Sequence, residues 1–157
     1  MADRLDLTVP LSIMAAFKSY VSPGFGEAAA KSYAYVQAVR VGDVLHLAGQ
    51  GGWDQKTLEV HNDVNAQIDQ AFANIDYNLK YAGGKGWSQV YKIRSYHIPL
   101  NTEAKDAMVR NFRKWMPETK AAWTCVQVGR LGEDNMKVEI EVEAYDPEGS
   151  KKSEERS

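Results

Sequence analysis

The sequence predicts an α+β domain built from a single mixed sheet with two helices on one face. Two long stretches carry apolar residues at three- and four-residue spacing, as amphipathic helices do. Five shorter stretches are rich in β-formers or alternate between apolar and polar side chains. They follow the order β-β-α-β-α-β-β, and 157 residues with 44% hydrophobic side chains suffice for one core of this kind.

The first two predicted strands, residues 36–40 and 44–48, form a hairpin. Gly42 and Asp43 lie between these β-rich segments and supply the turn. Gly49 follows the second strand closely, and a glycine there permits the close approach of another group.

A helix is predicted over residues 63–82, where Asp63 is a suitable N-cap and Gly83 a suitable C-terminal stop. Its apolar stripe consists of Val64, Ile68, Phe72, Ile75 and Leu79. A strand over 89–98 and a second helix over 102–116 follow, the helix ending before a proline.

Two further strands are predicted over 122–131 and 136–145. Period-two alternation places Trp123 and Cys125 on one face of the first strand, and Glu139 on the polar face of the second. We expect Trp123 on the sheet face that the helices leave uncovered. There it would contact another subunit or pack beneath the N-terminal segment.

The chain divides into an N-terminal extension over 1–32 that packs on the core, a main domain over 33–146 and a tail over 147–157. From residue 149 onward the tail has no apolar side chain, so we expect it to be disordered. The N-terminus lacks an apolar core of signal-peptide length and no apolar run is long enough to span a membrane, which favours a cytoplasmic protein.

Composition argues against several partners. The formal net charge is −2 and no basic stripe with interleaved aromatic residues is present, so nucleic acid is an unlikely partner. The three histidines, His46, His61 and His97, lack the spacing of metal ligands, and we expect neither a metal nor another cofactor.

An ordered set of segments resembles the Rid/YjgF family, the endoribonuclease L-PSP-like proteins. The segments cover residues 33–145 in the family's order and spacing. They are 35–43 (YVQAVRVGD), 47–50 (LAGQ), the long helix ending in 82–84 (AGG), 90–93 (VYKI), 125–131 (CVQVGRL) and 138–144 (VEIEVEA).

The resemblance implies a chorismate-mutase-like protomer that assembles as a homotrimer around a central barrel, with small-molecule pockets in the clefts between subunits. The activity typical of the family is hydrolysis of enamines and imines to a keto acid and ammonia. In that chemistry an arginine holds the substrate carboxylate and a glutamate positions or activates water.

Three polar pocket positions of the family are apolar in this chain. Trp123 stands where the family has its carboxylate-binding arginine, two residues before Cys125. Ala48 replaces a small hydroxyl residue, and Val109 replaces an asparagine. An indole has one N–H donor and no charge, so Trp123 cannot reproduce a bidentate grip on a carboxylate. Arg94 is a candidate for supplying that charge from another position, as is Arg130.

The residues that match the family's site are Tyr35, Gly49, Cys125 and Glu139. We predict Glu139, Tyr35 and His97 as catalytic residues. The predicted substrate-binding residues are Trp123, Cys125, Gly49, Ala48, Trp53 and Val109, with Trp53 and Trp123 able to form an aromatic wall. Structural roles remain open for several of them: Glu139 in a solvated row of acids, Tyr35 and His97 as packing residues, and Cys125 as a small core residue.

Several functions are compatible with these residues. The favoured one is a diverged trimeric enzyme that binds a neutral or aromatic molecule and performs acid/base chemistry such as hydrolysis, hydration, isomerisation or cyclisation. The alternatives are a conventional 2-imino acid deaminase and a non-catalytic ligand-binding or regulatory trimer. A ribonuclease is disfavoured by the negative net charge.

Overall fold

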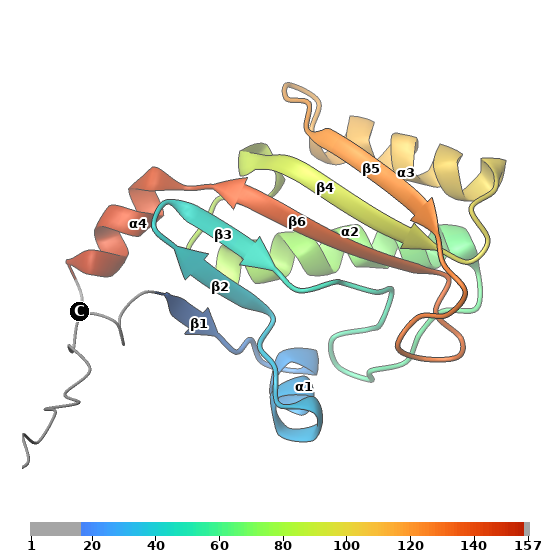
Figure 1. Cartoon of the computed structure of the whole chain (residues 1–157), viewed down its shortest axis with the longest axis horizontal. Helices are drawn as coiled ribbons and strands as arrows, with labels where there is room; N and C mark the ends of the chain where they lie inside the picture. The colour runs from blue at the N-terminus through green and yellow to red at the C-terminus, as the bar shows by residue number, and fades with distance from the viewer. Residues whose placement is uncertain (1–16, 156–157) are drawn as a thin grey trace, which may run out of the picture.

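A six-stranded sheet forms the centre of the computed structural model, which describes residues 17–155 (Figure 1). The strand order is β1-β2-β3-β6-β4-β5, with β4 and β5 parallel and all other neighbours antiparallel. The strands are β1 (Lys18–Tyr20), β2 (Ala38–Val41), β3 (Val44–Leu47), β4 (Val90–His97), β5 (Ala122–Gln127) and β6 (Val138–Tyr145). This arrangement confirms the predicted α+β class and the mixed sheet.

Two helices, α2 (Val64–Tyr81) and α3 (Thr102–Trp115), lie behind the sheet in Figure 1 and cover that face. Both begin as predicted: the side chain of Asp63 accepts a hydrogen bond from the Ala66 N–H, and Asn101 caps α3 in the same way. Their apolar stripes and the inward faces of β3, β4 and β6 form the core. Within residues 17–155, no helix is both long and apolar enough to cross a bilayer.

Strand β5 is shorter than predicted because its only partner ends. It pairs with β4 alone, and the last register pair joins His97 to Gln127. One more backbone hydrogen bond, from the Val128 N–H to the His97 carbonyl, closes this edge. Residues 128–137 therefore form a connection to β6 instead of the strand continuation that alternation predicts.

The N-terminal extension contains two elements that hydrophobic periodicity did not predict. Strand β1 pairs with β2 and adds an edge to the sheet. Helix α1 (Phe25–Tyr33) follows and lies below the sheet in Figure 1. Residues 17–32 of the predicted extension thus supply an edge strand of the sheet and most of α1, whereas residues 1–16 lie outside the described residues.

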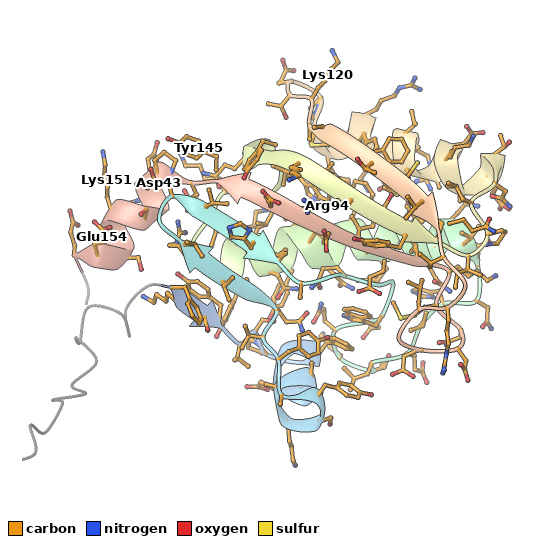
Figure 2. All side chains as sticks on the ribbon, in the orientation of Figure 1. Asp43, Arg94, Lys120, Tyr145, Lys151 and Glu154 are labelled. Carbon is orange, nitrogen blue, oxygen red and sulfur yellow. The ribbon has the colours of Figure 1, made fainter. Side chains whose placement is uncertain are left out.

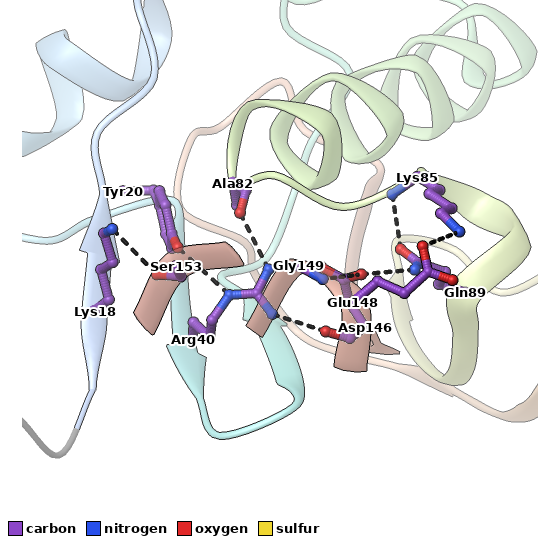
Figure 3. A network of polar contacts seen from close by, with 10 residues as sticks. All are labelled: Lys18, Tyr20, Arg40, Ala82, Lys85, Gln89, Asp146, Glu148, Gly149 and Ser153. Atoms are coloured by element: carbon purple, nitrogen blue, oxygen red, sulfur yellow. Dashed lines mark hydrogen bonds and ion pairs between the residues drawn. The ribbon is translucent and has the colours of Figure 1, made fainter. Parts of the chain in front are cut away.

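Helix α4 (Pro147–Glu154) corrects the disorder predicted for this part of the 147–157 tail, whereas residues 156–157 lie outside the described residues. A buried ion pair organises its start: Arg40 Nη2 lies 2.6 Å from Asp146 Oδ2, and Arg40 also donates to the carbonyls of Asp146 and Ala82 (Figure 3). The Asp146 carboxylate accepts from the Gly149 N–H, and Lys85 pairs with Glu148. Helix α4 is ordered by polar contacts to the rest of the protein. The absence of apolar residues from the tail gives no information about such contacts.

The sheet face toward the viewer in Figures 1 and 2 has no helix over it. Charged side chains form a ladder across β4 and β6 there, with Arg94 bonded to Glu141 and Glu143, and Lys92 also paired with Glu143. Aliphatic and aromatic groups flank the ladder, among them Val41, Tyr91, Val126 and Tyr145, all substantially exposed. We call this surface the open sheet face.

Candidate functional site

A cavity of about 950 Å³ lies where β6 meets α1 and two loops. We call it the Glu139 cavity. Its walls are Phe25, Ala28, Ala29, Ser32, Tyr33, Tyr35, Gly49, Trp53, Leu58, Glu59, Val60, Asn62, Gly132, Glu133, Asn135, Met136 and Glu139. Four of the predicted site residues, Tyr35, Gly49, Trp53 and Glu139, are therefore brought together.

Glu139 is half-buried on β6, in the row that also contains Glu141 and Glu143. Burial raises the pKa of its carboxyl above the ordinary value, and the nearby charge of Glu141 raises it further. A carboxyl with a raised pKa exchanges protons closer to neutral pH than an exposed one, as acid/base chemistry requires. Glu143, by contrast, has a lowered pKa because Tyr91 and Lys92 bond to it.

Gly49 lets the Glu139 carboxylate lie against the main chain. A β-carbon added at Gly49 would overlap Oε1 of Glu139 and approach its Cγ and Cδ to 2.6 Å. The next residue pairs with β6, since the Gln50 N–H donates to the Ile140 carbonyl at 2.8 Å and the reverse bond is 2.9 Å. These two bonds set the position of Gly49 relative to Glu139.

A buried network of amide side chains holds the loop after β3. The Gln50 side-chain amide donates to Gln37, and its carbonyl accepts from Asn78 of α2. Asn74, one turn earlier on α2, donates to the main-chain carbonyls of Gly51 and Trp53 at 2.9 Å each. Helix α2 thereby fixes the backbone on which Trp53 is carried into the cavity.

The aromatic floor of the cavity is a stacked pair. The rings of Phe25 and Trp53 are nearly parallel, with centroids 3.8 Å apart. Trp53 is only 4% exposed, and its indole nitrogen Nε1 is buried without a hydrogen-bond partner among the described residues. Such an N–H costs free energy until an acceptor reaches it.

Two tyrosines stand at the entrance. Tyr35 is 37% exposed and follows the left-handed residue Ala34 that ends α1. The Tyr33 hydroxyl donates to Glu133 at 3.2 Å, and this contact raises the pKa of the Tyr33 phenol. The entrance therefore presents aromatic rings and a carboxylate.

A second hollow, of about 500 Å³, lies between α3 and the start of β5, and we call it the Trp123 hollow. Its walls are Ile93, Phe112, Arg113, Met116, Pro117, Thr119, Lys120, Ala121 and Trp123. Trp53 and Trp123 thus line different cavities of the protomer, and the predicted aromatic wall is not formed within one chain.

The position of Trp123 corrects the expectation that it lies on the open sheet face or beneath the N-terminal segment. Its register partner on β4 is the core residue Ile93, so it lies on the side that the helices cover. Its ring meets Phe112 of α3 edge-on at 4.9 Å, and its Nε1 donates to Ser95 Oγ at 2.8 Å. Alternation along β5 defines two faces, but only the parallel register with β4 decides which one the helices cover.

His97 lies apart from the other two predicted catalytic residues. It is fully buried, and its register partner Val138 points into the core, on the face opposite Glu139. Its Nε2 contacts Ser95 Oγ at 2.8 Å, which extends the hydrogen-bond chain from Trp123. Burial lowers the pKa of His97 to about 4, so the ring is neutral at physiological pH.

The other predicted residues lie outside both cavities. Cys125 is half-buried on β5, Ala48 accepts a hydrogen bond from Gln50 through its carbonyl, and Val109 is half-buried on α3. Arg94 belongs to the charged ladder of the open sheet face, and Arg130 pairs with the exposed Asp134. Neither arginine reaches a cavity wall.

Pattern analysis missed the walls supplied by α1 and by the loops around residues 58–62 and 132–136. Phe25, Tyr33, Glu59 and Glu133 come from segments without helical or strand periodicity strong enough to place them. Among residues 17–155, no three His, Cys, Asp or Glu side chains gather in a way that could hold a metal ion.

Comparison with known proteins gives consistent matches. A sequence model described as endoribonuclease L-PSP matches residues 26–146. A RutC family protein of Pyrococcus horikoshii is 37% identical over 112 residues, which are 71% of this chain and 86% of that protein. The protein named 2-iminobutanoate/2-iminopropanoate deaminase in Escherichia coli K12 is 35% identical over 111 residues, which are 70% of this chain and 84% of that protein.

Solved structures match the fold as well. The crystal structure of RidA from an Antarctic Psychrobacter superposes with a TM-score of 0.64 at 32% identity, covering 71% of this chain and 87% of that one. The YjgF protein of Escherichia coli superposes equally well, with a TM-score of 0.64 at 34% identity. These likenesses confirm the predicted chorismate-mutase-like arrangement.

Proposed function

Because the chain belongs to the endoribonuclease L-PSP family, also called Rid/YjgF, we propose that it is a small-molecule enzyme whose acid/base group is Glu139. The observation that carries the proposal is the half-buried carboxylate of Glu139, with a raised pKa, in a large aromatic cavity. The substrate that fits this cavity is small, ring-bearing or apolar, and lacks a carboxylate.

Hydrolysis of a C=N bond is the reaction we favour among those open to this site. In it, Glu139 accepts a proton from water as the water oxygen bonds to the carbon of the protonated imine and the C=N π electrons move to nitrogen, which gives a carbinolamine. Glu139 returns that proton to the nitrogen, and the C–N bond then breaks as the carbinolamine hydroxyl loses its proton to Glu139 and becomes the carbonyl. An imine and one water thus yield a carbonyl compound and ammonia or an amine. The names of relatives about one third identical support this choice of reaction.

The missing carboxylate grip separates this proposal from conventional 2-imino acid hydrolysis. No arginine or lysine among residues 17–155 lines the Glu139 cavity, and Trp123 occupies the family's arginine position. A charge-assisted contact is worth a few kcal/mol when desolvated, so 2-imino acids are expected to be poor substrates. Conventional deaminase activity is the second candidate, favoured by the relatives' names.

We further propose that the working unit is a cytoplasmic homotrimer with its sites in the clefts between subunits. The open sheet face supports this, because it leaves Val41 and Tyr145 about half exposed. Light scattering at three times 17.5 kDa is expected, and a monomer mass would refute the assembly.

The catalytic claim is tested by generating imines in situ and following ammonia release. An amine oxidase acting on benzylamine supplies an imine without a carboxylate. We expect wild type to accelerate its hydrolysis and Glu139→Gln to lose at least about a hundredfold of that acceleration. Glu154→Gln, at the far end of α4 in Figure 2, is the charge-matched control. Equal rates for Glu139→Gln and wild type would refute the role of Glu139.

A further inference from the structure

The charged groups on the Glu139 cavity all have one sign. Glu59, Glu133 and Glu139 line it, whereas no Lys, Arg or His does so within the part of the chain that the structure describes. Lys137 belongs to the same region, but its ammonium donates to the carbonyl of Asn62 at 2.7 Å. The potential inside the cavity is therefore negative.

The aromatic groups of the cavity suit a flat cation. The stacked rings of Phe25 and Trp53 form one wall, and the exposed rings of Tyr33 and Tyr35 also line the cavity. Aromatic faces attract an organic cation through their negative π-density, and this attraction strengthens when the cation is desolvated. An anion on the same rings meets repulsion from the three carboxylates.

A third feature is a carboxylate at the cavity that is already held in place. Glu133 is already oriented, since one of its oxygens accepts from the Tyr33 hydroxyl. An incoming cation thus finds a carboxylate held in place.

We propose that the ligand of the Glu139 cavity is a small organic cation, a ring-bearing amine, amidine or iminium without a carboxylate. This inference rests on the proposed function and deepens it by naming the substrate class. The ring lies on the Phe25–Trp53 stack, and the positive nitrogen is held by Glu133 and Glu139. Selectivity follows from charge, because a neutral or anionic analogue keeps the stacking and loses the ionic contact.

Three probes with the same ring test this selectivity: benzylamine, benzyl alcohol and benzoate, titrated calorimetrically into the full-length protein at one ionic strength. Benzylamine is expected to bind about tenfold more tightly than benzyl alcohol, with benzoate the weakest. Glu133→Gln should weaken benzylamine binding about tenfold and leave benzyl alcohol unchanged, whereas Glu154→Gln should match wild type. Higher salt should weaken only benzylamine.

Methionine methyl resonances locate the binding without any variant. Met136 lines the Glu139 cavity and Met116 lines the Trp123 hollow, and both are buried. Saturating benzylamine should shift the Met136 methyl signal and leave that of Met116 in place. A shift of Met116 alone, no saturable binding of benzylamine, or binding of benzyl alcohol or benzoate as tight as that of benzylamine would each overturn the inference.

The outcome is separable from that of the proposed function. If Glu139-dependent imine hydrolysis is observed but the three probes bind equally, the enzyme assignment stands and the cation preference is wrong. If benzylamine binds selectively and Glu139→Gln hydrolyses imines as fast as wild type, the cation site stands and the catalytic role of Glu139 is wrong.

Discussion

The carboxylate of Glu139 lies directly against the α-carbon of Gly49, in space that any side chain at position 49 would occupy. The two segments are held together by the reciprocal backbone bonds of Gln50 with Ile140. The position of the Glu139 carboxylate therefore requires a glycine at residue 49, whereas no turn there requires one. The conformation of the cavity's acid depends on it.

Gly49→Ala tests this relationship. The new methyl group would displace the end of a flexible side chain, so we expect Tm to change little while imine hydrolysis falls as far as in Glu139→Gln. Gly129→Ala is the control, because a β-carbon there meets nothing within 4 Å. Wild-type hydrolysis in Gly49→Ala would show that the position of Glu139 is irrelevant.

Titration of Glu139 should reveal a raised pKa. Burial is the larger cause and Glu141 the second, so Glu141→Gln should lower the pKa of Glu139 without restoring the ordinary value. Because the folded-state pKa lies above the unfolded-state pKa, Glu139 reduces stability as pH rises between the two values. Carbon-detected NMR of labelled glutamate measures the pKa directly, and an ordinary value would contradict the buried site.

His97 should make folding stability sensitive to acid. Its folded-state pKa of about 4 lies below its ordinary 6.5, so the unfolded chain binds the proton more readily. The contribution of neutral His97 is complete above pH 6.5 and decreases as pH falls toward 4, by about 3 kcal/mol in all. Urea denaturation from pH 7 to 4 should show a shallower loss for His97→Gln, and parallel curves would refute the assignment.

Asp146 should be a major determinant of stability through Arg40. Asp146→Asn leaves the buried guanidinium without its counter-charge and weakens the cap of α4, so we expect a loss of about 3–5 kcal/mol in the free energy of unfolding. Arg40→Met combined with Asp146→Asn should lose less than the sum of the single changes. Additive losses in urea denaturation would show that the pair is not coupled.

The regular elements of the fold were predictable from local patterns. The stripe from Val64 to Leu79, the cap at Asp63 and the alternation around Glu139 each depend on near neighbours, and the structure confirms them. Helix α4 was missed because its order depends on Arg40, more than one hundred residues earlier in the chain. Such a contact leaves no local signal.

The candidate site was predictable in part. The resemblance to a family identified Tyr35, Gly49 and Glu139, which the structure gathers on one cavity. It also grouped Trp123 with them, and the choice among the three histidines added His97, whereas within one protomer both pack on the helix-covered side of the sheet. Phe25 and Glu133 could not be placed, since irregular segments and an unpredicted helix carry them. Tertiary register, not periodicity, decides these positions.

The most direct test of the account compares the hydrolysis rates of two matched imines, one from benzylamine and one from phenylglycine, which differ by a carboxylate. The account predicts that wild type hydrolyses the benzylamine-derived imine about tenfold faster or more, because residues 17–155 give the cavity three carboxylates and no lysine, arginine or histidine. Faster hydrolysis of the phenylglycine-derived imine would contradict the claim that the site does not bind a substrate carboxylate.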